Sequence, residues 1–287
     1  MLPFLGRRLL WTPFLMLFVS FFVFVLGYYG PGDPVEVQLG QAYTEERAER
    51  LREQRGLNDP FFIQYIRYIG KALKGDLGES YKFVGRGVSE LLGPKLVVSA
   101  QLFLSSFLIT VTIGVPLGFY SALRQGSWID PIVVSSTLAL YAMPVFLTAP
   151  ALIIVFSLHL GWVPVSGWGG FFDERTVLPA ITIGIPGVAV FTRLMRASTL
   201  DVLGQDFVRT AHAKGLHNIT VNYRHLARNA LIPVLTIIGF SVAGMLGGAL
   251  IVELIYGIPG VARLSLDAIF QRDFPVLTAF VLLGSLM

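Results

Sequence analysis

Apolar residues gather in long, nearly unbroken runs along this 287-residue chain. About 20 apolar residues are enough for a helix to cross the hydrocarbon core of a bilayer. Five runs reach that length or approach it, and they predict membrane spans at Leu9–Tyr29, Leu96–Tyr120, Ile132–Leu158, Val177–Thr192 and Leu231–Tyr256. The last run, Phe274–Met287, has 14 residues and predicts an incomplete sixth span or a partial element. The predicted fold class is therefore all-α, a polytopic transmembrane helical bundle of about six spans.

The longest polar region follows the first span. Residues 31–95 hold ten cations and ten acids, so the region is neutral overall. Within it, Thr44 is a plausible N-cap and Gly56 a plausible C-terminal glycine of a charged helix. A second, amphipathic helix is expected over Pro60–Leu73. We therefore expect a small helical insertion at 31–95, between a first segment at 1–30 and a core transmembrane domain at 96–287.

Composition supports a membrane protein. Hydrophobic residues make up 54% of the chain and charged residues 14%, whereas soluble domains average about 25% charged residues. The chain has no cysteine, which excludes disulfides, thiolate metal sites and thiol nucleophiles. The first apolar run follows two arginines but is too long for a typical signal peptide, so we expect an uncleaved first span.

The distribution of cations predicts the orientation of the spans, because Lys and Arg in short loops favour the cytoplasmic side. The N-terminus, Ser121–Pro131 and Arg193–Arg228 together carry nine cations, against three in His159–Thr176 and Gly257–Asp273. We therefore expect the N-terminus and the long basic segment in the cytoplasm, and the helical insertion on the extracytoplasmic side.

The basic segment Thr199–Arg228 has the pattern of two short helices. Asp206 is placed to cap the helix FVRTAHAK, and Gly215 to end it. Asn218 would cap a second helix whose apolar stripe contains Ile219, Tyr223, Leu226, Ala227 and Ala230. Pro233 predicts a kink beyond it. A two-turn helix is unstable alone in water, so it needs a surface to lie on. A loop of lipid-facing cations is the alternative interpretation.

Polar and small residues inside the predicted spans are candidates for a permeation pathway. Glu253 is the ionisable residue well inside a predicted span, and it either lines a pathway or outer gate or is an interfacial carboxylate. Gly244 and Gly248 form a small-xxx-small pair suited to close helix packing. Arg193 and Arg196 lie near a helix end and are expected to extend their charged groups to the membrane surface.

Prolines add a second set of pathway candidates. Pro144, Pro179 and Pro186 are expected to break helices within spans and to expose carbonyl groups along a cavity. Tyr141 and Met143 either line such a cavity or face lipid or the protein core.

No catalytic constellation is present in the sequence. It lacks the phosphate-binding loop pattern that ends in Gly-Lys-Ser or Gly-Lys-Thr, and it lacks a Gly-x-Ser-x-Gly elbow. His212, His217 and His225 do not have the spacing of a zinc helix, and no acid or cysteine completes a metal site. We expect a protein without enzymatic activity, catalytic residues, metal or cofactor of its own.

Several ordered motifs resemble one family. DFVRTAHAKGL followed by RHLARNALIPV is similar to the cytoplasmic motif of inner-membrane permease subunits of ATP-binding-cassette importers. GPGDPVE, GVPLGFYSALRQGSWID, LGWVPVSGW and VELIYGIPGVARLSLDAIFQRDFPV extend the resemblance over most of the chain. The match is to the B-type subunit of the dipeptide, oligopeptide and nickel branch.

The resemblance implies a function and a set of partners. The chain would form a translocation pathway for peptides or related small solutes in the bacterial inner membrane. It would pair with a second homologous permease, two ATPase subunits that bind ATP and Mg, and an extracytoplasmic solute-binding protein. The helix that docks on an ATPase subunit, the coupling helix, would use Asp206, Phe207, Arg209, Thr210, Ala211, Ala213, Lys214 and Gly215. The pathway or gate would use Tyr141, Met143, Pro144 and Glu253.

One departure from the family pattern lies in the coupling helix. The broad pattern begins Glu-Ala-Ala, and here Arg209, Thr210 and Ala211 occupy those positions while Gly215 is kept. A contact that depends on the glutamate is therefore in doubt. The main alternative function is an ion-gradient-driven secondary transporter, which predicts inverted repeats and paired intramembrane charges. A membrane enzyme and a non-transporting scaffold are the further alternatives.

Overall fold

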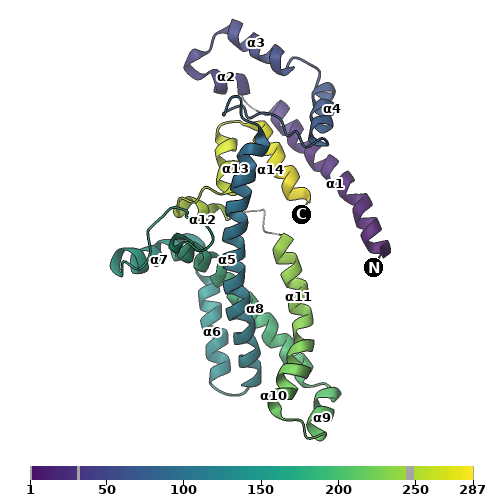
Figure 1. The fold of residues 1–287 in the computed structure, drawn as a ribbon, viewed down its shortest axis with the longest axis vertical. Coiled ribbons are helices and arrows are strands. Elements are labelled where there is room, and N and C mark those ends of the chain that lie inside the picture. Colours follow the sequence, from purple (N-terminus) through teal and green to yellow (C-terminus); the bar gives the residue numbers. More distant parts are fainter. Residues whose placement is uncertain (1, 31–32, 244–248, 287) are drawn as a thin grey trace. The chain divides into compact units, whose positions relative to one another are not determined.

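The computed structural model describes residues 2–30, 33–243 and 249–286. Within these residues all named secondary-structure elements are helices, and the only β-pairing is one isolated bridge between Glu79 and Gly87. This confirms the all-α prediction. Contacts divide the chain into two compact units, residues 1–98 with 260–287, and residues 99–259. The helix α5 (Val88–Leu123) contributes its first turns to one unit and the remainder to the other (Figure 1).

The first unit combines the two ends of the chain. It contains α1 (Leu2–Tyr29), α2 (Pro34–Leu39), η1 (Gly40–Ala42), α3 (Glu45–Arg55), α4 (Phe61–Ala72), the start of α5, α13 (Val261–Phe270) and α14 (Phe274–Leu286). Val88 and Leu92 of α5 pack with Leu264 of α13 and Val276 of α14 in a buried apolar cluster. The corner between α13 and α14 is fixed by Asp273, which accepts hydrogen bonds from the Ser80 hydroxyl and the Tyr81 amide.

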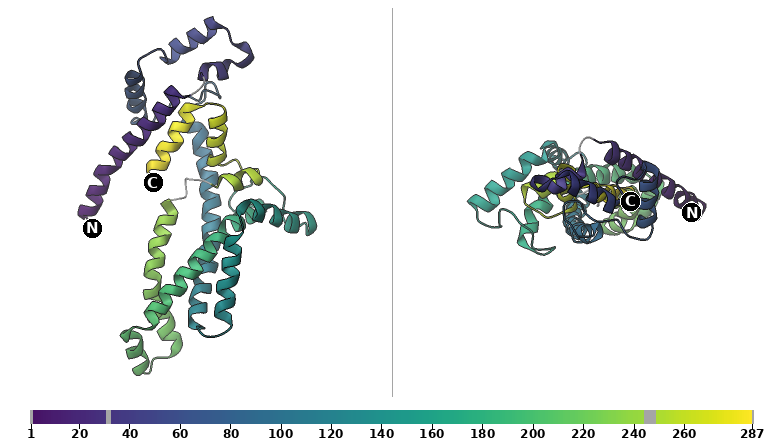
Figure 2. Two further views of the ribbon diagram at one scale, coloured as in Figure 1. Left: turned by 180° about the vertical axis from the view of Figure 1, so that it is seen from behind. Right: turned by 90° about the horizontal axis from the view of Figure 1, so that it is seen from above.

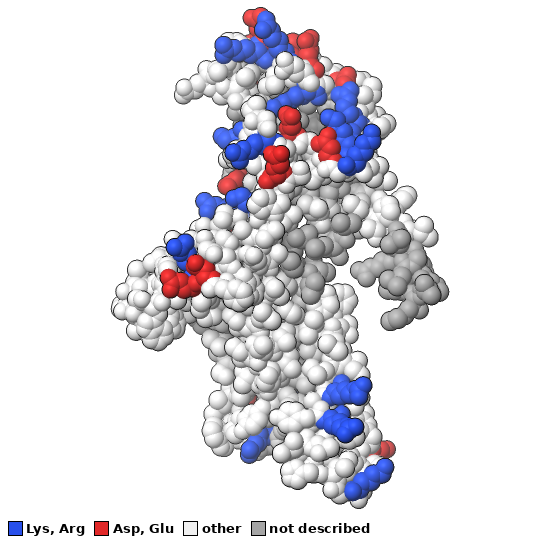
Figure 3. Space-filling model, viewed as in Figure 1, with Lys and Arg blue, Asp and Glu red and all other residues white. Residues whose placement is uncertain are grey.

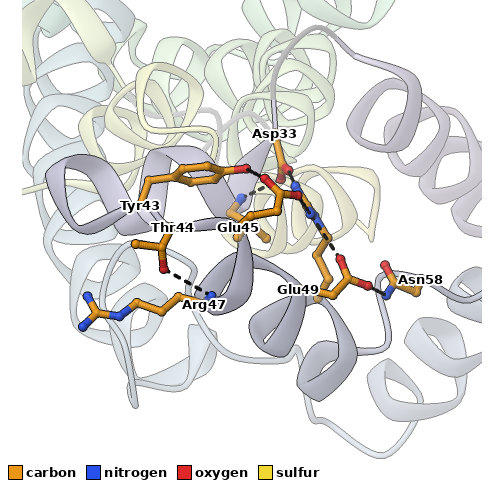
Figure 4. Close-up of polar contacts among 9 residues, drawn as sticks. Asp33, Tyr43, Thr44, Glu45, Arg47, Glu49 and Asn58 are labelled. Atoms are coloured by element: carbon orange, nitrogen blue, oxygen red, sulfur yellow. Dashed lines mark hydrogen bonds and ion pairs between the residues drawn. The ribbon is translucent and has the colours of Figure 1, made fainter.

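A polar network orders the α2–α3 part of this unit (Figure 4). The Thr44 side chain caps α3 by accepting from the Arg47 amide at 3.4 Å. Gly56 ends the helix with a positive φ of 63°, so both predicted helix ends are confirmed. The Arg52 guanidinium donates to Asp33 at 2.5 Å and so ties α3 to the start of α2.

The second unit holds the remaining helices. They are the rest of α5, α6 (Ile129–Ala142), α7 (Val145–Leu152), η2 (Ile153–His159), η3 (Glu174–Thr176), α8 (Val177–Leu203), α9 (Asp206–Ala213), α10 (Asn218–Thr220), η4 (Val221–Leu226), α11 (Ala227–Ala243) and α12 (Leu250–Ile255). The elements η1 and η3 are 3₁₀ turns, and η2 and η4 are π-helical. In the left view of Figure 2 the later part of α8 lies beside α11, and contacts between the two helices confirm the pairing.

Among the described residues, three helices are long and apolar enough to cross a membrane: Leu10–Tyr29, Val88–Leu123 and Glu174–Leu203. The predicted span Ile132–Leu158 is not one straight helix. It bends by 99° between Ile129–Ala142 and Val145–His159, because Met143 before Pro144 adopts an extended backbone. If this bent pair is one span, the helices make up to four crossings.

Two further predictions about the spans concern the prolines of α8 and the run Leu231–Tyr256. Pro179 and Pro186 were expected to break a helix, but α8 is continuous through both. Pro179 lies in the first turn, where a missing amide hydrogen breaks no helical bond. The predicted span Leu231–Tyr256 is seen as α11 and α12, and residues 244–248 between them, with the Gly244 and Gly248 pair, lie outside the described residues.

Close packing of glycines does occur, between α5 and α8. A side chain at Gly114 would lie 2.9 Å from the Val188 carbonyl oxygen, and one at Gly118 would lie 2.9 Å from Cβ of Met195 and still closer to the Thr192 carbonyl. The Thr192 hydroxyl donates to the Gly114 carbonyl at 3.2 Å. Small residues at i and i+4 therefore let the two backbones approach closely.

Candidate functional site

The short helix α9 follows α8 directly. α8 ends at Leu203, and Gln205 takes an extended backbone (φ −81°, ψ 149°) as the N-cap without a side-chain cap bond. The prediction that Asp206 is the cap is wrong by one residue. Asp206 lies in the first turn instead, where the positive end of the helix dipole stabilises its carboxylate.

The other end of α9 is a Schellman motif. Gly215 has a φ of +74°; its amide donates to the His212 carbonyl at 2.9 Å, and the Leu216 amide donates to the Ala211 carbonyl at 3.3 Å. This pair of bonds satisfies carbonyls that the helix end would leave open. The prediction that Gly215 ends the helix is confirmed. Residues with a side chain disfavour the left-handed conformation that the turn requires.

One face of α9 is anchored to the helical bundle. Val208 and Ala211 are buried, 3% and 5% exposed. They lie one turn apart and join a core cluster of residues from α5, α8, η4 and α11, namely Phe119, Phe191, Met195, Val202, Val221, Leu226, Ala230 and Val234. This packing joins the short helix to α8 and α11 through one apolar cluster.

The opposite face of α9 is open. Seven of the eight residues predicted for docking are exposed, namely Asp206, Phe207, Arg209, Thr210, Ala213, Lys214 and Gly215. Ala211 is the exception, because its methyl group faces the core cluster. Figure 3 shows Lys and Arg with little Asp or Glu around this end of the second unit. The surface is a compact basic knob rather than a deep pocket.

The chain returns from α9 through a π-helical turn. The His217 ring, through Nδ1, accepts from the Ile219 amide at 3.3 Å and caps α10, so the predicted cap at Asn218 is wrong by one residue. In the predicted apolar stripe, Leu226 and Ala230 are buried, but Ile219 and Tyr223 are 63% and 70% exposed. The π-helical turn of η4 is wider than an α-helical turn, so it changes the angle between successive side chains. Residues spaced at about 3.6 per turn therefore do not lie on one face here.

The predicted pathway residues Tyr141, Met143 and Pro144 lie at the break between α6 and α7, and all three are exposed. Pro144 is the N-cap of α7 and has an extended backbone. The Arg193 guanidinium of α8 lies 5.3 Å from the centre of the Tyr141 ring, a distance suited to a cation–π contact. The break thus presents an aromatic ring and irregular backbone in one place.

Glu253 is buried. It lies on α12 with no exposed surface, and its carboxylate accepts from the Ser99 hydroxyl of α5 at 2.7 Å. The next turn is closed by Gly257, with φ +65°, and the Ile258 amide donates to the Glu253 carbonyl at 2.8 Å. This carboxylate therefore ties α12 to α5 in this conformation.

An ion pair that sequence reasoning missed joins α6 to α8. Arg196 donates to both oxygens of Asp130 at 2.6 Å, and the Ser121 hydroxyl donates to Asp130 at 2.5 Å. Arg196 was expected to extend to the membrane surface, and the structure adds a carboxylate partner on α6 that this prediction did not include. Two parallel bonds to one carboxylate are the strongest geometry that a guanidinium offers. The spacing of the two residues in sequence gives no signal for the pair.

Taken together, the apolar spans and all-helical architecture define an integral membrane protein. Residues 114–287 match the family model described as "Binding-protein-dependent transport system inner membrane component", and residues 1–99 match "Binding-prot-dependent transport system membrane comp, N-term". The chain belongs to this family of binding-protein-dependent inner-membrane transport components.

Curated relatives align along nearly the whole chain. "Probable peptide ABC transporter permease protein y4tP" of Sinorhizobium fredii is 35% identical over 287 residues, covering 98% of this chain and 91% of the relative. "Di/tripeptide transport system permease protein DppB" of Pseudomonas aeruginosa is 37% identical over 311 residues, covering 99% and 92%. "Glutathione transport system permease protein GsiC" of Escherichia coli is 35% identical over 286 residues, covering 100% and 92%.

These matches establish the role of the chain. It is an inner-membrane permease subunit of an ATP-binding-cassette importer, in the branch of the peptide importers. It is a transport component rather than an enzyme, and it works in a complex with partner subunits.

Proposed function

We propose that this permease forms the translocation pathway for di- and oligopeptides or related small solutes, and that α9 is its coupling helix. The names of the relatives support the substrate class, since they include peptide, di/tripeptide and glutathione permeases. The observation that carries the coupling role is the two-sided character of α9, which buries Val208 and Ala211 and exposes its other face.

The geometry suggests how force would reach the spans. An ATPase subunit that binds the exposed face of α9 displaces the helix when it closes on ATP. Val208 and Ala211 pass this displacement to the core cluster shared by α8 and α11. Different contacts of the ATPase in its open and closed states then favour different helix arrangements. ATP and Mg belong to the ATPase subunits in this proposal.

The proposed complex has four other protein subunits of three kinds. They are a second homologous permease, two ATPase subunits and an extracytoplasmic solute-binding protein, all within the membrane lipid. The cation distribution supports a cytoplasmic N-terminus and a cytoplasmic α9, with the 31–95 insertion on the extracytoplasmic side. The proposed gate lies at the α6–α7 break around Tyr141, Met143 and Pro144, with Glu253 holding α12 in the closed arrangement.

Uptake by the reconstituted importer tests this function. The complete complex in proteoliposomes should accumulate a labelled tripeptide only when ATP reaches the ATPase subunits, and an ionophore should leave accumulation intact. Uptake that continues without ATP and collapses with the ionophore would support the ion-gradient-driven alternative instead. A panel with a dipeptide, glutathione and a nickel salt would then define the solute class.

A further inference from the structure

The helix α4 carries three stripes of different chemistry. Phe61, Tyr65 and Tyr68 form one stripe at helical spacing, and their rings lie against aromatic rings of α1 such as Phe24, at centroid distances of 5.5 to 5.9 Å. A second, adjacent stripe is apolar and contains Phe62, Ile66 and Ile69, and the C-cap Leu73 continues it. The third stripe is basic and contains Arg67 and Lys71, and Lys74 continues it in the turn after the helix.

The second stripe has no cover within the described chain. Phe62 is 66% exposed, Ile66 68% and Leu73 84%. Large apolar side chains gathered on one exposed face mark a surface that meets another apolar phase. A helix with such a face and Lys or Arg on its polar face is suited to lie in a membrane interface.

The contacts between α4 and α1 place this face at membrane depth. The Tyr65 hydroxyl donates to the Leu17 carbonyl at 3.0 Å and lies 2.9 Å from the Ser20 hydroxyl. Leu17 lies about 18 Å along the helix axis from Tyr29, the end of the candidate span. The hydrocarbon core is about 30 Å thick. The Tyr65 contact therefore lies inside the depth that α1 crosses, beside apolar α1 side chains such as Phe18 that are themselves exposed.

We propose that α4 is embedded in the leaflet at the C-terminal end of α1, with Phe62, Ile66 and Leu73 against lipid acyl chains. Exposed apolar side chains of α1, such as Phe18, would face the same lipid, and Lys71 and Lys74 on the polar side complement anionic headgroups. The insertion after the first span is then a membrane-anchored structure and not a wholly aqueous one. The proposal rests on the family's membrane location and is independent of the coupling role of α9.

Spin labels test this placement directly, because the chain has no cysteine of its own. Ile66→Cys and Phe62→Cys would be labelled in the complete importer in nanodiscs, and collision with oxygen and with a water-soluble nickel chelate would be measured. Phe18→Cys on α1 is the lipid reference, Glu53→Cys on α3 the water reference, and Lys71→Cys the matched control on the polar side of α4.

Labels at positions 66 and 62 should resemble the Phe18→Cys label, with an oxygen-to-nickel collision ratio several-fold higher than at position 71. A nickel collision rate equal to that at Glu53→Cys would show that the face meets water and would overturn the proposal. Shielding from both reagents would show that a protein partner covers the face, and this result would overturn it as well.

Discussion

The helices α9 and α4 are both short and amphipathic, yet they expose opposite faces. α9 buries Val208 and Ala211 and exposes a mainly polar and basic face that also includes Phe207 and Ala213. α4 packs one aromatic stripe against α1 and leaves a second apolar stripe, including Ile66, exposed. This difference motivates the two proposed surroundings, a protein partner in the aqueous phase for α9 and lipid for α4.

A charge on the buried face of α9 should have the largest effect on the stability of the permease. Ala211→Asp places a carboxylate in the core cluster without a partner, and an uncompensated buried charge costs about 3 kcal/mol or more. We expect loss of folded, assembled permease, measured as the recovery of the complex and its thermal midpoint.

Ala213→Asp is the matched control, because Ala213 lies on the same helix but is exposed. It should leave the folded permease intact while it weakens ATP-dependent uptake. Equal recovery of the two variants would contradict the two-sided description of α9.

A substitution at the α5–α8 crossing tests whether the bundle under α9 is as tightly packed as described. Gly118→Val forces a side chain into the Thr192 backbone, and overpacking of this kind costs about 1–3 kcal/mol. The thermal midpoint of the complex should fall. Gly93→Val on the same helix meets nothing within 4 Å and should leave the midpoint nearly unchanged, so a similar fall in both would refute close packing at this crossing.

Substitution of Gly215 in the Schellman motif of α9 should reduce stability less, but should clearly reduce the coupling of transport to ATP hydrolysis. Gly215→Val strains a left-handed residue, at a cost of about 1–2 kcal/mol. Peptide uptake per ATP hydrolysed should drop while membrane insertion persists. Gly204→Val is the control, because Gly204 has a φ of −77°. An unchanged uptake-to-hydrolysis ratio in Gly215→Val would argue against a role for this turn.

The smallest structural effect is expected at Glu253. Glu253→Gln keeps an oxygen that accepts from Ser99, and a neutral hydrogen bond contributes about 1 kcal/mol. Assembly should be unchanged, while uptake should change if the carboxylate helps to hold the gate. Wild-type uptake by a stably assembled Glu253→Gln variant would leave Glu253 with a purely structural role.

Local sequence signals predicted local structure well. Thr44, Gly56 and Gly215 each act through bonds to residues within a few positions, so their pattern alone was sufficient. Three of the apolar runs likewise predicted the long helices Leu10–Tyr29, Val88–Leu123 and Glu174–Leu203, because the bilayer sets the length of a span. Predicted caps at Asp206 and Asn218 missed by one residue, since neighbouring residues can also adopt the extended cap conformation.

Features that depend on tertiary pairing were not predictable from one sequence. The burial of Ala211 depends on where α8 and α11 lie, and the Asp130–Arg196 pair joins residues 66 positions apart. The glycine pair Gly114 and Gly118 had a readable small-xxx-small spacing. Its meaning became clear only with Val188 and Thr192 of α8 opposite it.

Crosslinking at Ala213 tests the coupling role of α9 most directly. With the cysteine-free chain as background, Ala213→Cys in the complete importer should crosslink to an ATPase subunit, and ATP should change the yield. Gln125→Cys, exposed in the turn between α5 and α6 on the same predicted side of the membrane, should give little product. A crosslink from Gln125→Cys alone, or a product with lipid but no ATPase subunit from Ala213→Cys, would contradict the account.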